Sequence, residues 1–463
     1  MQIFADNRLI TKVFAACVCL VAASVPAYCE EATSISIEPA RFGFEISNGE
    51  LRSGNGRRVT TNDDDGNPVT ATLHVEVGDH RIVLLPDGTL VARKSSEAAV
   101  TDRAFTPVTH DELLERLANE FPDFETKKSR RYVYVYNTSE GFATATQRII
   151  ESMYNGVVIH AKAQSIKVHD PQVPMIVIMF RTEGEYQKYQ RMPAGMVAYY
   201  HILTNRVVMF EQASRPPPIP EMALRQSLST IAHEGAHQIL HNIGVQQRLS
   251  MWPMWLAEGY AEYMAPTSAA KDLRWKGAGQ INDMRMFELE EYLKSRSNEA
   301  LDGQTIEQTV RAQRLTSTGY ASAWSLTHLL AKNRRYDLNA YINQVSRLGP
   351  LEGLADNVGS FKRAFGDDLA AIEKQLVVHL KKQPYKSPFA DFPHYLVLVS
   401  YNDGRRLKRE ANMFPSRETA LLWEREVLAA IPADQRGTAE HTIRQFPNRV
   451  AANRVLLQFT RNK

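Results

Sequence analysis

The residues of this chain that are best suited to do chemistry are two histidines and a glutamate at close spacing. His233, Glu234 and His237 occur in the run His-Glu-Gly-Ala-His. An α-helix turns about 100° per residue, so these three side chains fall within about 100° of one another. Two imidazoles four residues apart can reach one metal ion, and the glutamate projects to the same side. The spacing therefore predicts a metal site with a carboxylate beside it.

The stretch around this motif has the pattern of a core helix. Apolar residues recur there at helical spacing, at Leu224, Leu228, Ile231, Ile239 and Ile243. Gly244 then suits a left-handed helix cap. Two histidines and a glutamate beside an apolar stripe are costly to bury unless they are satisfied, for instance by a cation. His241 is a candidate for a third ligand, but the helix drifts about 40° further with each step of four residues. We therefore expect His241 to be structural.

A second helical segment, at residues 255–263, supplies carboxylates. Glu258 and Glu262 are four residues apart and lie on one face of that helix. Glu258 can complete a zinc site of two histidines and one carboxylate that keeps its fourth position for water. Glu262 can accept a hydrogen bond from the outer nitrogen of a ligand histidine and fix its tautomer. The alternative is two exposed carboxylates on a surface helix, which the flanking Trp255 and Tyr260 disfavour.

Together the two segments resemble a known group of enzymes, the gluzincin or thermolysin-like clan of zinc metallopeptidases. The shared residues are His233, Glu234, His237, Trp255, Leu256, Glu258, Gly259, Ala261 and Tyr263. Within the clan the chain is most similar to an uncharacterised bacterial family of exported proteins with a peptidase-MA-like domain. The resemblance covers about residues 105–382, including the stretch at 361–368. It implies one zinc ion per chain, held by His233, His237 and Glu258, with Glu234 as the general base.

Two further site residues come from this resemblance. Gluzincins of the aminopeptidase type have a tyrosine about sixty residues after the zinc glutamate, whose phenol donates to the oxyanion. Tyr320 lies 320 − 258 = 62 residues after Glu258; the alternative is a core tyrosine. The sequence motif with which such aminopeptidases bind the substrate amine is absent. Residues 209–212 match that motif weakly, which makes Glu211 a candidate for binding the amine. We expect the strand at 207–211 to be instead the sheet edge to which an extended peptide adds.

These residues predict an exported zinc metallopeptidase that acts on a peptide or protein. Zinc would polarise the scissile carbonyl and lower the pKa of its water to about 7. Glu234 would take the proton from that water and return it to the leaving amine. The alternative is a non-catalytic cell-envelope binding or scaffold protein on a peptidase-derived, metal-binding fold. The presence of Glu234 argues against that alternative, since a decayed site would tend to lose its base first.

Composition limits the remaining possibilities. The chain has 463 residues, of which 44% are hydrophobic and 23% charged, as in ordinary globular proteins. Its 55 basic and 52 acidic side chains give a net charge of +3, which gives no reason to expect a nucleic-acid partner. Cys17, Cys19 and Cys29 all lie near the N-terminus. The folded body therefore has neither a disulfide framework nor a cysteine zinc site.

The N-terminus has the features of an export signal. Arg8 and Lys12 precede an apolar run at residues 13–25, and small residues follow up to Ala27, where a signal peptidase would cut. The run is too short for a membrane span, which needs about 20 residues. We expect a signal peptide at 1–27, cleaved after Ala27 or Cys29, no membrane span after cleavage, and a periplasmic or extracellular protein. An uncleaved anchor is the alternative.

The order of the predicted elements indicates an α+β protein with three folded parts. Alternating apolar residues such as Leu73, Val75 and Val77 predict a small β domain at 30–105. A small α+β appendage is expected at 392–463, with a strand at 395–400 and a helix capped by Ser416.

Between these two parts we expect the gluzincin-like domain at 106–383. It begins with a helix capped by Thr109 and Glu112. Strands at 132–136 and 175–180 and a hairpin at 197–203 and 207–210 form a mixed sheet with an edge strand. The active-site helix starts at Pro220, and a helical subdomain follows.

Overall fold

The computed structural model describes most of the chain beyond the predicted leader. The described residues are 34–193, 195–214, 220–268, 273–295, 300–385, 387, 390–404 and 406–461. The predicted signal peptide and all three cysteines lie outside them. Helices and strands are both abundant, and the predicted α+β class is confirmed. Within the described residues no helix combines the length and the apolar character that crossing a membrane requires.

The N-terminal β domain is an antiparallel sheet. Its strands are β2 (Leu51–Ser53), β3 (Arg58–Asn62), β4 (Pro68–Val77), β5 (His80–Leu84), β6 (Leu90–Lys94) and β7 (Ala99–Thr101), in the order β6-β5-β4-β3-β7 with β2 beside β4. Leu73, Val75 and Val77 are buried, as their alternation predicts. The domain shares a core with the central domain, because Val75 and Val77 belong to the same buried cluster as Leu249 and Leu351.

The first strand of the described chain pairs outside this sheet. β1 (Ser34–Ser36) runs antiparallel to β15 (Glu352–Leu354), which lies far along the chain in the helical region. The Ile37 backbone N–H continues the pairing by donating to the Leu351 carbonyl at 2.7 Å. Residues 34–37 therefore pair with the central domain before the chain enters the sheet of the β domain.

A five-stranded mixed sheet forms the middle of the central domain. Its strands are β8 (Glu125–Lys128), β9 (Tyr132–Tyr136), β10 (Met175–Thr182), β11 (Ala198–His201) and β12 (Arg206–Gln212), in the order β11-β12-β10-β9-β8. β9, β10 and β12 are parallel, and β8 and β11 are antiparallel edges.

The sheet corrects one expectation, because β12 lies between β10 and β11 and is not the edge. The hairpin turn at Asn205, whose φ is 57°, folds β11 back along the free side of β12. An edge position depends on where the hairpin partner lies, and the composition of residues 207–211 does not contain that information.

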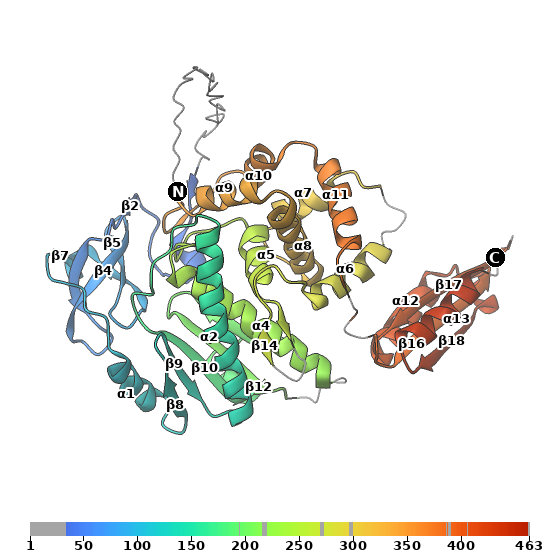
Figure 1. Cartoon of the computed structure of the whole chain (residues 1–463), viewed down its shortest axis with the longest axis horizontal. Coiled ribbons are helices and arrows are strands. Elements are labelled where there is room, and N and C mark those ends of the chain that lie inside the picture. The colour runs from blue at the N-terminus through green and yellow to red at the C-terminus, as the bar shows by residue number, and fades with distance from the viewer. Residues whose placement is uncertain are drawn as a thin grey trace, which may run out of the picture. The chain divides into compact units, whose positions relative to one another are not determined.

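Helices cover both faces of this sheet (Figure 1). On one face α1 (His110–Glu120) and α3 (Glu183–Tyr189) share a core with apolar residues of β9, β10 and β12. On the other face lie α2 (Glu140–Ala163) and α4 (Pro220–Asn242), which pack on each other. The predicted capping box of α1 is present: Thr109 Oγ1 accepts from the Glu112 N–H, and the Glu112 carboxylate accepts from the Thr109 N–H.

A helical subdomain follows α4. It consists of α5 (Met254–Met264), α6 (Asp283–Ser295), α7 (Gln304–Arg311), α8 (Ser317–Asn333), α9 (Arg335–Val345), α10 (Asn357–Phe365) and α11 (Leu369–Lys381), with a short hairpin of β13 (Thr267–Ser268) and β14 (Arg274–Trp275). α5 packs closely on α8 at Gly259, where a Cβ would lie 2.5 Å from the Ala323 carbonyl oxygen. Glycine at this position therefore sets the distance between the helix that carries Glu258 and the helix that carries Tyr320.

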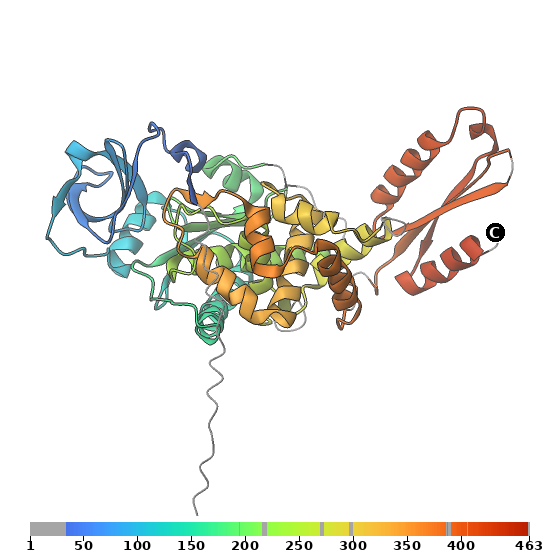
Figure 2. The same ribbon diagram turned by 90° about the horizontal axis from the view of Figure 1, so that it is seen from above.

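The C-terminal part is a three-stranded antiparallel sheet with a helix on each side (Figure 2). Its elements are β16 (His394–Asn402), β17 (Leu407–Phe414), α12 (Arg417–Ala430), β18 (Glu440–Phe446) and α13 (Arg449–Arg461). The predicted strand at 395–400 lies within β16. Ser416 caps α12 as predicted, because its side chain accepts from the Thr419 N–H.

Candidate metal centre

Three side chains from two helices bring their ligand atoms together. His233 Nε2 lies 3.1 Å from His237 Nε2 and 3.1 Å from Glu258 Oε2. His237 Nε2 lies 3.4 Å from the same oxygen of Glu258. This is the group of residues that the sequence predicted as metal ligands, and its donor atoms can hold one metal ion.

The distances between the three ligand atoms fit tetrahedral coordination of a cation. When bonds are about 2.0–2.1 Å long, neighbouring ligand atoms of a tetrahedral zinc site lie about 3.3 Å apart. The observed separations of 3.1, 3.1 and 3.4 Å surround that value. Two imidazole lone pairs and a carboxylate oxygen repel one another at this range unless a proton or a cation lies between them. The donor set of two nitrogens and one oxygen therefore suits a divalent metal ion that keeps one open position.

The long helix α4 positions the two histidines. The side chain of Gln238 anchors the helix to the sheet, because its amide donates to the carbonyls of Ile176 at 3.0 Å and Asn205 at 2.8 Å. On the neighbouring helix α2, Ile150 lies 3.5 Å from where a Cβ of Gly235 would be. The helix ends at Asn242, and Gly244, two residues later, has the left-handed conformation that was predicted, with a φ of 81°. These contacts fix the rotation of α4, so His233 and His237 face α5.

Glu258 is buried beside the two imidazoles. Burial by itself would raise its pKa, but the neighbouring imidazoles of His237 and His233 outweigh burial and lower that pKa. The carboxylate therefore stays ionised, which is the form that ligates a metal ion.

A buried network supports His233 from behind. Glu262 Oε1 lies 3.1 Å from His233 Nδ1, the ring nitrogen opposite the ligand atom. The Glu262 carboxylate also accepts from Arg285 Nη2 at 2.7 Å and from Asn282 Nδ2 at 2.8 Å. Burial would raise the pKa of Glu262, but Arg285 and then His233 lower it to about 2. The network holds a charged acceptor against the outer nitrogen of His233.

Sequence reasoning predicted Glu262 but missed Arg285 and Asn282. Both lie at or near the start of α6, more than twenty positions after Glu258. No spacing rule connects them to the motif, because the strands β13 and β14 separate α5 from α6 along the chain. Only the packing of α6 against α8 brings them to Glu262.

Glu234 lies beside the ligand group without belonging to it. Its Oε2 accepts a hydrogen bond from the backbone N–H of Tyr200 on β11 at 2.8 Å. Burial raises the pKa of Glu234, and the neighbouring His233 and His237 oppose that rise. The edge strand of the sheet therefore positions this carboxylate, a contact that sequence reasoning also missed.

Tyr320 lies in the first turn of α8, next to the same group. Its ring centroid is 5.9 Å from that of His233, in an edge-to-face arrangement. The guanidinium carbon of Arg285 lies 5.4 Å from the Tyr320 ring centroid. The tyrosine is half-buried, and burial raises its pKa well above the ordinary value. The phenol therefore stays protonated and able to donate a hydrogen bond.

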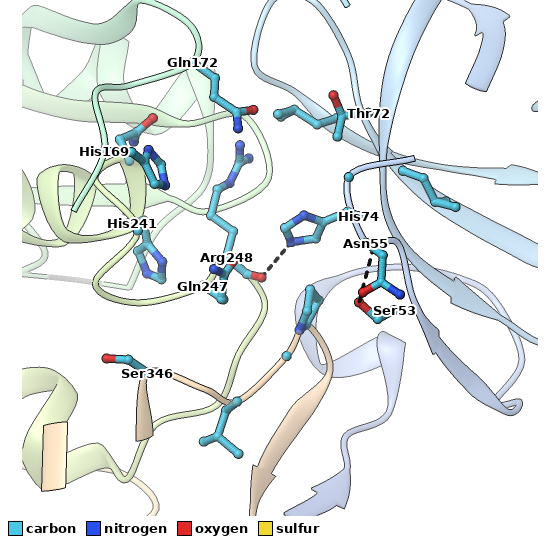
Figure 3. Close-up of a pocket in the computed structure, with 18 of the residues that line it drawn as sticks. Ser53, Asn55, Thr72, His74, His169, Gln172, His241, Gln247, Arg248 and Ser346 are labelled. Atoms are coloured by element: carbon cyan, nitrogen blue, oxygen red, sulfur yellow. Dashed lines mark hydrogen bonds between the residues drawn. The ribbon is translucent and has the colours of Figure 1, made fainter. Parts of the chain in front are cut away.

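The two remaining candidates have structural partners elsewhere. The Glu211 carboxylate accepts from the backbone N–H of Ser139 at 2.8 Å and from the Ser139 hydroxyl, at the N-terminus of α2. His241 is not among the grouped ligands. Its Nδ1 donates to the Gln246 carbonyl at 3.2 Å, and its ring stacks on Tyr200 with centroids 5.5 Å apart. His241 also lines a separate cavity that contains Arg248 (Figure 3).

Comparison with protein families gives a match to part of the chain. Residues 227–352 match a family described as "Protein of unknown function (DUF1570)". The matched stretch runs from α4 to β15 and contains the three grouped ligands, Glu234, Glu262, Arg285 and Tyr320. No curated protein matches the chain. The family description names no activity.

Proposed function

We propose that the protein is a zinc-dependent metallopeptidase. The observation that carries the proposal is the convergence of His233, His237 and Glu258 on one point, with a second carboxylate, Glu234, beside it. The donor set supports zinc, because two imidazoles and one carboxylate leave an open position on a tetrahedral ion. When bound, zinc supplies Lewis acidity, which polarises a substrate carbonyl and lowers the pKa of a water to about 7.

In the proposed reaction Glu234 moves the proton. Its carboxylate takes a proton from the attacking water and passes it to the nitrogen of the leaving amine as the peptide bond breaks. The products are then a carboxylic acid, which keeps the second proton of the water, and an amine, and the glutamate returns to its starting state. The bond from the Tyr200 N–H fixes one carboxylate oxygen and leaves the other available to the water.

The edge strand β11 supports an extended peptide as substrate. The Tyr200 N–H points away from β12, since it donates to Glu234. In an antiparallel strand the N–H and C=O groups of one residue point to the same side. The outward backbone groups of β11 therefore lie on the side of Glu234, where a peptide can add as a further strand. Tyr320, beside His233, would donate to the oxyanion that forms on the attacked carbonyl.

We also propose that the reaction takes place outside the cytoplasm. The support is the sequence of the first 27 residues, with their basic start and short apolar run. Mass spectrometry of the protein from the producing cells tests this proposal. A mature chain that begins at Tyr28 or near Glu30 supports export, and an intact Met1 segment contradicts cleavage.

The deciding experiment compares the wild type with Glu234→Gln and His237→Ala. Metal content is measured after zinc reconstitution, and cleavage is measured on a mixed peptide library. We expect about one zinc per wild-type chain, loss of zinc in His237→Ala, and retained zinc without cleavage in Glu234→Gln. Glu151→Gln is a matched control, because the Glu151 carboxylate accepts from the Tyr134 hydroxyl at 3.0 Å and is not among the grouped ligands.

The outcomes separate the two candidate functions. A wild-type protein that binds no zinc contradicts the metal centre itself. A zinc-loaded wild type that cleaves no library peptide favours the binding or scaffold protein instead. A zinc-loaded Glu234→Gln variant as active as the wild type removes the general-base assignment.

A further inference from the structure

A second site of the molecule is a cavity of about 580 Å³ lined by the β domain and the central domain (Figure 3). Ser53, Asn55, Thr72 and His74 line it from the β domain. The end of α4 and the loop after it contribute His241 and Arg248. None of the three grouped ligands, His233, His237 and Glu258, lines it. Its volume lies within the range of small-molecule sites, about 300–1,000 Å³.

The cavity lining has basic but no acidic side chains. Two guanidinium groups, those of Arg248 and Arg347, and three imidazoles line it, together with several amides and hydroxyls. None of the described lining residues is an aspartate or a glutamate. The lining thus differs from the whole chain, in which acidic and basic side chains nearly balance.

Arg248 carries a buried positive charge, and no carboxylate of the described residues lies within hydrogen-bond distance of it; Asp87 acts on it only at longer range. Only 8% of the residue is exposed. Its guanidinium donates to the backbone carbonyls of Gly88 at 2.8 Å, Leu203 at 2.8 Å and Ile202 at 2.9 Å. These carbonyls use four of the five guanidinium N–H groups. Carbonyl dipoles hold the side chain in place, but they do not cancel its charge.

The charge of Arg248 acts on the cavity walls. Burial is the largest cause of the lowered pKa values of His74, about 4, and His241, about 3. The Arg248 guanidinium lowers both pKa values further, for His241 after His237, and for His74 against the opposing hydrogen bond to the Arg248 carbonyl. The two imidazoles are therefore neutral near pH 7 and do not add to the charge. Arg347 is exposed at the mouth. The cavity offers positive potential from two guanidinium groups to an occupant.

The imidazoles contribute acceptors. His74 Nε2 faces the Arg248 carbonyl at 2.8 Å, and His169 Nδ1 faces the Asp170 carbonyl at 2.9 Å. A carbonyl oxygen can only accept, so each of these ring nitrogens carries the proton. The same holds for His241 Nδ1 at the Gln246 carbonyl. In its neutral form, each of these rings keeps one nitrogen that can accept a hydrogen bond.

We propose that this cavity binds a small organic anion, one that carries a carboxylate or phosphate group together with hydroxyl or amine donors. The acidic group matches the positive potential of Arg248 and Arg347. The donors match the free imidazole nitrogens and the side-chain amide oxygens. The inference does not depend on peptidase activity, since none of the residues that line the cavity belongs to the group of candidate metal ligands His233, His237 and Glu258.

The test is calorimetric titration of the full-length protein, without added metal, at constant ionic strength. The probes are inorganic phosphate, L-malate and L-glutamate, with sodium chloride as the non-specific anion. We expect at least one probe to bind with a Kd of about 1 mM or tighter, and chloride to bind far more weakly. Comparing the Kd of phosphate with the Kd values of malate and glutamate shows whether the cavity prefers a phosphate or a carboxylate group.

Two isosteric variants place a negative charge in the lining. Gln172→Glu and Asn55→Asp keep the shape of each side chain, and the introduced carboxylate of Asn55→Asp can still accept from the Ser53 hydroxyl, as Asn55 Oδ1 does at 2.8 Å. We expect each to weaken probe binding at least tenfold. Gln187→Glu is the matched control outside the cavity, because Gln187 Oε1 only accepts from the Met192 N–H. No binding of any probe at 10-fold higher concentration than the expected Kd overturns the proposal, as does equal binding by the lining variants and the control.

Discussion

The removal of the Arg285 guanidinium is the most direct test of how the candidate centre is supported. In Arg285→Met the side chain keeps much of its apolar stem but can no longer donate to Glu262. The Glu262 side chain is 2% exposed, and its remaining partners are Asn282 and His233. The Glu262 carboxylate, which faces His233 Nδ1, then has one hydrogen bond fewer, and no guanidinium offsets its negative charge.

Two magnitudes follow from this geometry. Loss of a partner behind a metal-ligating histidine typically weakens metal affinity about 10–100-fold, which is about 1.4–2.7 kcal/mol. Removal of one member of a buried ion pair costs about 3–5 kcal/mol of folding stability. The Arg285 side chain is 21% exposed and Glu262 keeps two partners, so we expect the lower end, about 3 kcal/mol.

The assay is zinc competition against a chromophoric chelator, together with the visible spectrum of the cobalt-substituted protein and denaturant unfolding of the metal-free protein. Arg285→Lys keeps the charge and should restore part of the affinity. Arg206→Met is the matched control, because Arg206 pairs with Glu120 away from the centre and its side chain is 18% exposed. That control should lose stability and keep zinc affinity. Equal zinc affinity and equal cobalt spectra in Arg285→Met and wild type would refute the supporting role of Arg285.

Three further changes have defined outcomes. Tyr320→Phe should lower turnover on a cleaved peptide by about 10²–10³-fold with zinc content unchanged, whereas a core tyrosine would leave the rate within a few-fold. Gly259→Ala should lower the free energy of unfolding by about 1–3 kcal/mol, because its Cβ meets the Ala323 carbonyl; an unchanged denaturation midpoint contradicts this packing. Burial, then Arg248, lower the pKa of His74 to about 4, so His74 contributes stability above its unfolded pKa of about 6.5 that is lost as the pH falls towards 4. The loss is about 3 kcal/mol, and His74→Gln should remove that part of the pH dependence measured by denaturant unfolding.

The spacing of residues within single helices and strands was sufficient to predict much of the candidate site and of the secondary structure. The relation between His233, Glu234 and His237 depends only on the geometry of one helix, so sequence spacing was sufficient to place them on one side. The same applies to Glu258 and Glu262, and to the capping box of Thr109 and Glu112. Strand positions followed from alternation and from runs of β-branched and aromatic residues. Each of these features is set by neighbours within a few positions along the chain.

The tertiary structure decided which distant residues complete the site. Arg285 and Asn282 reach Glu262 because α6 packs on α8, and Tyr200 reaches Glu234 because β11 is the sheet edge. The sequence placed that edge one strand away, at residues 207–211. Strand order depends on which side of β12 the hairpin returns along, and pairwise packing of helices depends on surfaces from separate segments. Neither strand order nor helix packing can be read from the residue spacing within one segment. Local spacing therefore predicted the grouped residues His233, His237 and Glu258, and the tertiary structure determined which distant residues hydrogen-bond to that group.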